Sequence, residues 1–302
     1  MGSSIETRRA LVNERGSSPS RSRLLTMAAT EEYRLVSREL EPEPTVIEVG
    51  GRRLGDGYFG LIAGPCTVES REQTLATARA VAAAGASMLR GGAFKARTSP
   101  YAFQGLGREG LEILAAAKRE TGLPLVTELI DPRLIDEIVE VADVIQIGAR
   151  NMHNAILLAE VGKLDKPVLL KRGPSASLDE LLMAAEYIVK GGNGRVILCE
   201  RGIRTFERST RYTLDIAAVP VLKQQTHLPV VVDPSHAAGR RDLVLPLARA
   251  AVAAGADGII VEVHPDPDEA LCDGPQQIST DDFGAFVREL NELVRLMKKQ
   301  IG

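Results

Sequence analysis

One pattern recurs along most of this chain and restricts the folds open to it. A short aliphatic run ends at a chemically reactive residue, and a helical segment rich in Ala and Leu follows. The clearest copy is Val230-Val231-Val232, which leads directly into Asp233-Pro234-Ser235-His236. Strands that alternate with helices predict a parallel sheet, because a parallel connection needs a long crossover. Further copies are Ile62–Cys66, Val168–Gly173 and Ile259–His264.

Eight strands of this kind can be assigned, which is the number in a (β/α)₈ TIM barrel. Such a barrel takes ~250 residues, and the chain has 302. The predicted strands span 59–64, 87–90, 124–128, 144–148, 167–171, 195–200, 229–233 and 258–263. Helices are predicted over 72–84, 109–120, 154–160 and 282–298, with two more opening at Asp131-Pro132 and at Ser177. We therefore expect the functional residues at the carboxyl ends of the strands.

The residues before the barrel divide into two parts. Residues 1–30 are rich in Ser and Arg and lack an apolar period, which favours a disordered leader, or a true chain start at Met27. A transit peptide is less favoured because Glu6 and Glu14 interrupt the segment. Residues 31–58 form a short extension, whose residues 45–54 predict a β-hairpin over one end of the barrel. The catalytic barrel is predicted over 59–302.

Charge and cysteine content exclude several classes of protein. A net charge of −3 does not predict a nucleic-acid-binding surface. No apolar run approaches the ~20 residues that span a bilayer, so we expect no membrane association. The three cysteines are too few and too scattered for a disulfide framework, which favours the reducing cytoplasm.

Four potential metal ligands follow strands that are neighbours in such a barrel. Cys66 ends the first strand, His236 follows the seventh, Glu262 lies near the end of the eighth, and Asp273 follows it. A thiolate, an imidazole and two carboxylates suit Zn²⁺, Fe²⁺ or Mn²⁺ better than Mg²⁺. Alternatives exist for two of them, because a free cysteine is often only a buried apolar group and a histidine here can cap a helix. Glu262 sits inside an apolar strand and needs a partner there.

Three further residues of ligand type receive other interpretations. We interpret Cys199 and Cys272 as structural residues. His264 is a spare ligand or a residue that supports the ligands.

Basic residues also gather at the strand ends. So many cations at one mouth would repel one another unless an anionic ligand neutralised them, and Arg and Lys suit phosphate and carboxylate. We expect one substrate with both groups, or two phosphorylated substrates. Ion pairs with Glu69, Glu128 and Glu200 are the structural alternative for some of them. The basic residues are Arg90, Lys95, Arg97, Arg150, Lys171, Arg172, Arg201 and Arg204.

Six short motifs together closely resemble the 3-deoxy-D-arabino-heptulosonate 7-phosphate (DAHP) synthases, in their compact type I beta branch. The resemblance runs from about Tyr33 to the C-terminus. The motifs are Gly64-Pro65-Cys66-Thr67-Val68-Glu69-Ser70, Lys95-Ala96-Arg97-Thr98-Ser99-Pro100-Tyr101, Gln146-Ile147-Gly148-Ala149-Arg150-Asn151, Leu170-Lys171-Arg172-Gly173, Leu198-Cys199-Glu200-Arg201-Gly202 and Asp233-Pro234-Ser235-His236.

The resemblance implies the first step of the shikimate pathway of aromatic amino acid biosynthesis. Phosphoenolpyruvate, erythrose 4-phosphate and water would give DAHP and phosphate. A divalent ion (Mn²⁺, Fe²⁺, Zn²⁺ or Co²⁺) would be held by Cys66, His236, Glu262 and Asp273, and the enzyme would be a homotetramer or homodimer. Lys95 is expected to deliver a proton, with a metal-bound water as the alternative. Phosphoenolpyruvate would contact Arg90, Lys95, Ala149, Arg150, Lys171 and Arg201, and the phosphate of the aldose would contact Arg97 and Thr98.

Two departures from the family pattern lead to further expectations. The family usually has proline where this chain has Ala96, which predicts a less rigid substrate loop. About 40 residues precede the hairpin, too few for the regulatory domain of many relatives, so we expect no feedback inhibition. The alternative activity is that of 3-deoxy-D-manno-octulosonate 8-phosphate synthase with arabinose 5-phosphate, whose loop shares Ala96. A non-catalytic barrel is a third possibility, although no ligand or basic residue is missing.

Overall fold

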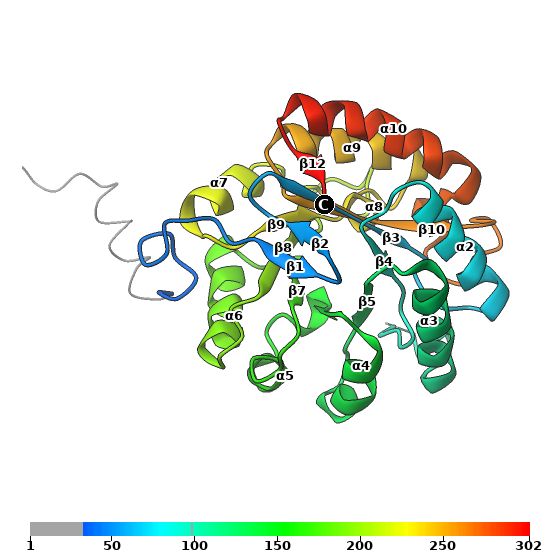
Figure 1. Cartoon of the computed structure of the whole chain (residues 1–302), viewed down its shortest axis with the longest axis horizontal. Coiled ribbons are helices and arrows are strands. Elements are labelled where there is room, and N and C mark those ends of the chain that lie inside the picture. The colour runs from blue at the N-terminus through cyan, green and yellow to red at the C-terminus, as the bar shows by residue number, and fades with distance from the viewer. Residues whose placement is uncertain (1–32, 98) are drawn as a thin grey trace, which may run out of the picture.

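The computed structural model of the protein describes residues 33–97 and 99–302. Within this part of the chain, eight parallel strands close into a barrel that the helices surround, which confirms the predicted fold class (Figure 1). Each predicted strand agrees with an observed one to within one residue at either end. The strands are β3 (Tyr58–Gly64), β4 (Met88–Arg90), β5 (Leu125–Glu128), β6 (Val144–Ile147), β7 (Val168–Lys171), β8 (Val196–Glu200), β9 (Val230–Val232) and β10 (Gly258–His264).

The barrel closes where the last strand pairs with the first. Gly258 of β10 lies opposite Gly60 of β3, and five residues of each strand are in register. A Cβ at residue 258 would lie 2.5 Å from the carbonyl oxygen of Gly60, so only glycine permits this approach. Closure gives every strand two neighbours and leaves no open sheet edge in the barrel.

The helices cover the outside of the barrel and enclose the larger of two apolar cores. None of the described helices is long and apolar enough to cross a membrane. The helices are α2 (Arg71–Ala83), α3 (Arg108–Thr121), α4 (Ile135–Val141), α5 (Ala155–Val161), α6 (Leu178–Lys190), α7 (Ala218–Gln225), α8 (Pro234–Ala238), α9 (Arg241–Ala253) and α10 (Thr280–Leu296).

The predicted helix starts are confirmed at two places. Asp131 Oδ1 accepts the backbone N–H of Arg133 at 2.9 Å, and a short 3₁₀ turn, Pro132–Leu134, leads into α4. Ser177 and Glu180 form the expected capping box at the start of α6. The sequence did not assign ranges to α7, α8 and α9, and Pro246 inside α9 is a residue that argues against a helix.

The hairpin lies across the end of the barrel opposite the strands' carboxyl ends (Figure 1). Its strands β1 (Ile47–Val49) and β2 (Arg52–Leu54) join through Gly50 and Gly51, which both have positive φ. Ile47, Val49 and Leu54 form one buried cluster with side chains from inside the barrel, whereas Glu48 is exposed. The predicted covering role is therefore confirmed. The predicted leader, residues 1–30, lies outside the described residues.

Two further short strands pair with the ends of barrel strands. β12 (Gln300–Ile301) pairs with the start of β3, next to the hairpin, and β11 (Ile278–Ser279) pairs with the end of β10. β11 thereby holds the loop that carries Asp273 against the mouth of the barrel.

We expect the hairpin to contribute strongly to stability. Leu54→Ala should lower the free energy of unfolding by about 2–5 kcal/mol, because Leu54 is fully buried at the barrel's end. Val46→Ala is the matched control, since Val46 is 41% exposed and should cost under about 0.5 kcal/mol. Urea denaturation measures both variants, and equal effects would contradict the covering role.

Candidate active site

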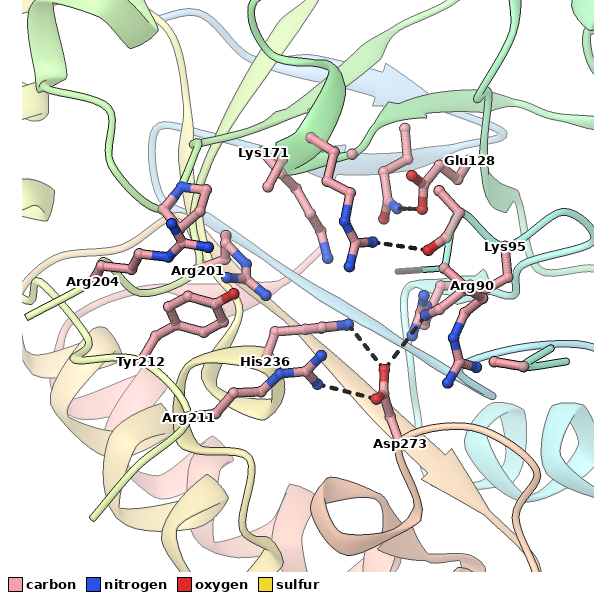
Figure 2. Close-up of a pocket in the computed structure, with 18 of the residues that line it drawn as sticks. Arg90, Lys95, Glu128, Lys171, Arg201, Arg204, Arg211, Tyr212, His236 and Asp273 are labelled. Atoms are coloured by element: carbon pink, nitrogen blue, oxygen red, sulfur yellow. Dashed lines mark hydrogen bonds and ion pairs between the residues drawn. The ribbon is translucent and has the colours of Figure 1, made fainter. Parts of the chain in front are cut away.

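A cavity of about 430 Å³ opens at the carboxyl ends of the strands, opposite the hairpin. Ala149 and Arg150 follow β6, and His236 lies on α8, directly after β9. Figure 2 shows that side chains from separate elements, among them Lys171, Arg201 and His236, point into one space. The cavity is therefore at the place that a TIM barrel uses for chemistry.

Basic side chains dominate the lining of the cavity. All the expected basic residues line it except Arg172, and Ala149 lies among them. Arg211 and Tyr212 also line the cavity and were not predicted, because they come from the long loop after β8, where no apolar period indicates the direction of a side chain. Thr98 lies outside the described residues. The lining cations are Arg90, Lys95, Arg97, Arg150, Lys171, Arg201, Arg204 and Arg211.

The four expected metal ligands meet at one side of this cavity. Asp273 Oδ2 lies 3.4 Å from Cys66 Sγ and 3.8 Å from His236 Nε2. His236 Nε2 also lies 3.4 Å from Glu262 Oε1. Asp273 has φ +54°, the left-handed region that Asp tolerates better than most residues, and this turns its carboxylate toward the other three. Figure 2 shows His236, Arg211 and Lys95 all directed at Asp273.

Burial and charge set the protonation of these groups. Burial would raise the pKa of Glu262, but His236, Arg90 and Lys95 outweigh it and lower this pKa to about 2. Burial would likewise raise the pKa of Asp273, but its neighbours Lys95, His236 and Arg211 lower this pKa. Burial lowers the pKa of His236, which favours the neutral imidazole that metals bind. Burial raises the pKa of the Cys66 thiol, so this sulfur needs a cation to ionise.

Asp233 links the metal-ligand side of the cavity to the cationic side. Its Oδ2 lies 2.8 Å from His236 Nδ1 and 2.5 Å from Lys171 Nζ, and its Oδ1 accepts the backbone N–H of His236. The carboxylate therefore fixes the imidazole with Nε2 toward Glu262 and Asp273. It also holds the Lys171 ammonium at the cavity wall.

Glu262 has partners for both oxygens. Arg90 NH1 donates to Oε1 at 2.5 Å, and Gln276 Nε2 donates to Oε2 at 2.6 Å. Lys95 Nζ lies 2.8 Å from Cys66 Sγ and 3.5 Å from Asp273 Oδ2. Arg90 and Lys95 thus contact the acidic and sulfur groups of the expected metal ligands, so these groups lie in a place that favours a positive charge.

Arg172 has a structural role. Its guanidinium NH1 lies 2.8 Å from both Glu200 Oε2 and Asp215 Oδ2. Glu200 Oε1 accepts the backbone N–H groups of Gly202 and Asp215. The Arg172–Glu200 pair therefore anchors both ends of the loop after β8. For Arg172 this confirms the structural alternative, an ion pair with Glu200, over a role in ligand binding.

Cys272 and His264 differ in their relation to the ligands. Cys272, interpreted from the sequence as structural, has its Sγ 3.5 Å from Cys66 Sγ and 2.9 Å from Arg97 NH1. The structure thus brings it into the donor cluster. His264 instead lies 3.4 Å from Glu69 Oε2, and it accepts the N–H of Asp266 through Nδ1.

Arg201 stacks on an aromatic ring at the cavity wall. Its guanidinium carbon lies 4.3 Å from the ring centre of Tyr212. The same tyrosine is held through its backbone N–H, which donates to the carbonyl of Ala237 at 2.9 Å. The orientation of the Arg201 side chain therefore depends on Tyr212 of the loop after β8, and not only on the strand that Arg201 follows.

Comparison with known proteins places this geometry in context. Residues 43–299 match the model of the DAHP synthetase I family. A phospho-2-dehydro-3-deoxyheptonate aldolase of Thermotoga maritima is 55% identical over 86% of this chain and 77% of its own length. A 2-dehydro-3-deoxyphosphooctonate aldolase of Syntrophotalea carbinolica is 34% identical over 84% of this chain and 98% of its own length.

Solved structures give the same result. The crystal structure of the Thermotoga maritima DAHP synthase has a TM-score of 0.87 and 52% identity, over 89% of this chain and 79% of that one. A truncated form of the 3-deoxy-D-arabino-heptulosonate 7-phosphate synthase from the same organism has a TM-score of 0.84 and 49% identity. The match covers 90% of this chain and all of that one.

The buried pair at the loop after β8 yields a stability prediction. Glu200→Gln should cost about 3–5 kcal/mol of unfolding free energy, because Arg172 loses its buried counter-charge. Asp215→Asn removes a carboxylate from the same guanidinium, but this side chain is 25% exposed and its loss should cost about 1 kcal/mol or less. Guanidinium chloride denaturation compares the two, and a larger loss in the Asp215 variant would refute this assignment.

Proposed function

The chain belongs to the DAHP synthetase I family, and from this premise we propose how its strand-end site carries out the DAHP synthase reaction. The enzyme joins phosphoenolpyruvate to erythrose 4-phosphate with water and releases DAHP and phosphate. The 55% identity to a DAHP synthase, against 34% to an octulosonate-forming relative, favours this reaction over the alternative.

The observation that carries the proposal is the meeting of two kinds of group in one cavity. Eight cationic side chains line it, and a cluster of metal-ligand type made of His236, Glu262 and Asp273 stands at its side. Two phosphorylated substrates need cations for their phosphates, and an aldehyde needs an electrophilic partner for its oxygen. Residues suited to both requirements line or adjoin the same cavity of about 430 Å³, which supports the proposal.

The cations divide into two groups by position. Lys171 lies at the end of β7, Arg150 follows β6 and Arg201 follows β8, so these three adjacent strands would hold phosphoenolpyruvate together with the backbone of Ala149. Arg90 and Lys95 would complete its binding from the side of the metal ligands. Arg97, with Thr98, would hold the phosphate of erythrose 4-phosphate. Positioning of two anions in this way can supply ~7–11 kcal/mol of the barrier.

The residues present fit a divalent metal ion. Cys66, His236, Glu262 and Asp273 would hold it, and the mixed sulfur, nitrogen and oxygen set suits Mn²⁺, Fe²⁺, Zn²⁺ or Co²⁺. When bound, such an ion supplies Lewis acidity at the aldehyde oxygen of erythrose 4-phosphate.

The bond changes follow from the chemistry of an enol phosphate. C3 of phosphoenolpyruvate attacks the aldehyde carbon, and a C–C bond forms while positive charge develops at C2. Water adds at C2 and loses a proton. The resulting hemiketal phosphate breaks its C–O bond and releases phosphate, which leaves the keto group of DAHP. Atoms balance, because the water oxygen becomes the C2 oxygen of the product.

Lys95 is the proposed proton donor to the new alkoxide. Burial would lower the pKa of Lys95, but Cys66, Glu262, Cys272 and Asp273 around it raise this pKa, so the side chain carries its proton. Its Nζ lies within 3.5 Å of two proposed metal ligands, which supports a role as proton donor to the oxygen that the ion would polarise.

Two properties of the whole molecule are also proposed. The three cysteines are free thiols, which is consistent with a cytoplasmic enzyme. A homo-oligomer, either a homotetramer or a homodimer, is proposed from the resemblance to the family alone.

The reaction can be tested by phosphate release. Release should require both phosphoenolpyruvate and erythrose 4-phosphate, stop with EDTA and return with added Mn²⁺, because the ligands would lose and regain the ion. Activity that survives chelation would remove Cys66 and His236 from the proposed ligands.

Two histidine variants provide the matched comparison. His236→Ala should lose bound metal and lower turnover by roughly 100-fold or more, because the ion supplies several kcal/mol of charge stabilisation. His153→Ala changes an exposed histidine outside the donor cluster and should keep both metal and turnover. Metal content by mass spectrometry and turnover are measured on the same samples.

The aldose specificity separates this activity from its alternative. We expect kcat/KM for erythrose 4-phosphate to exceed that for arabinose 5-phosphate by roughly 100-fold or more. Ala96, which the alternative family shares, contributes its carbonyl oxygen to Arg150 NH1 at 2.8 Å. That contact uses only the backbone, so Ala96 itself should not select the sugar. A preference for arabinose 5-phosphate would overturn the assignment.

A further inference from the structure

The donor cluster contains one sulfur more than the four proposed ligands account for. Two groups of three residues each bring their ligand atoms within 4.8 Å of one another. One group is Cys66, Cys272 and Asp273, and the other is His236, Glu262 and Asp273. The two groups share Asp273. Cys272 is its chain neighbour, and its Sγ lies 3.5 Å from Cys66 Sγ. A cation bound near Asp273 would therefore face two sulfurs.

One buried side chain holds the two cysteines together. The amide oxygen of Gln277 accepts the backbone N–H of Cys66 at 3.3 Å, and its Nε2 donates to the backbone carbonyl of Cys272 at 2.9 Å. Gln277 itself is fully buried. The pairing of the two thiols is therefore built into the fold, although 206 positions separate them in the chain.

Each sulfur also lies against a cation. Lys95 Nζ is 2.8 Å from Cys66 Sγ, and Arg97 NH1 is 2.9 Å from Cys272 Sγ. Both thiols are buried. Neither sulfur is surrounded by apolar side chains alone, because a basic side chain contacts each of them. The surroundings of Cys272 are thus those of a ligand rather than of an apolar filler.

We propose that Cys272 is a second sulfur ligand of the metal ion, beside Cys66. The proposal rests on the proposed function, because it concerns the same ion. A site with two thiolates is softer than one with a single thiolate, so it should select Zn²⁺ over Mn²⁺ more strongly. Binding through Cys272 also replaces the contact that holds Arg97, the residue proposed to bind the aldose phosphate.

The first test uses the unaltered full-length protein. The reduced, metal-free protein is loaded with one equivalent of Zn²⁺ and studied by X-ray absorption at the zinc edge. We expect about two sulfur ligands per zinc, at ~2.3 Å from the metal. One sulfur per zinc would overturn the proposal. This measurement needs no variant, so it does not depend on whether a substitution folds.

The second test measures selectivity between metals. Cys272→Ser should weaken Zn²⁺ binding roughly tenfold or more and Mn²⁺ binding by less than about threefold, because Mn²⁺ gains little from sulfur. Cys199→Ser is the matched control, since Cys199 is buried inside the barrel and its Sγ contacts the carbonyl of Glu200. It should leave both affinities unchanged. Competition dialysis gives both constants, and circular dichroism checks the fold of each variant.

The outcomes separate this proposal from the proposed function. One sulfur per zinc, with phosphate release still sensitive to chelator, would overturn the role of Cys272 alone. An equal effect of Cys272→Ser on Zn²⁺ and Mn²⁺ would overturn it as well. A protein that binds no metal and releases phosphate in EDTA would overturn both proposals together.

Discussion

A buried charge must be compensated, and this requirement organises the mouth of the barrel. Three strand-end cations are paired with acids from other strands: Arg90 with Glu262, Lys171 with Asp233, and Arg172 with Glu200. Each pair is almost completely buried, so loss of one partner leaves an uncompensated charge inside the protein. These pairs join β4 to β10, β7 to the end of β9 and β7 to β8. Electrostatic compensation therefore fixes the side chains of the site before any ligand is considered.

These ion pairs have different roles within the site. Arg172 and Glu200 are occupied with one another and with the loop after β8, so they hold structure. Asp233 instead shares its charge between Lys171 and His236, and thus couples the place proposed for phosphoenolpyruvate to the place proposed for the metal ion. A displacement of Lys171 would therefore change the position or charge environment of His236 through the Asp233 carboxylate, and the reverse also holds.

The barrel fold and most of the site residues could be predicted from the sequence. Parallel strands that alternate with helices bring their carboxyl ends to one mouth, so residues such as Cys66 and His236, far apart in the chain, could be placed together. Contacts that depend on irregular loops could not be. Arg211, Tyr212 and Cys272 lie in segments without a period, and the positions of their side chains depend on tertiary contacts such as those of Gln276 and Gln277. No range was predicted for helix α9, which contains Pro246, a residue that is unfavourable inside a helix.

The hairpin at the opposite end has a consequence for the order in which the chain assembles. Ile47, Val49 and Leu54 precede every barrel strand in the chain, yet they pack against side chains that all eight strands contribute. Closure also waits for β10 to reach β3, nearly the whole barrel away in sequence. These two sets of contacts join distant parts of the chain, and contacts of that kind form slowly. During synthesis the hairpin's apolar face is therefore made early and buried late, and it stays exposed while the barrel strands are still being added.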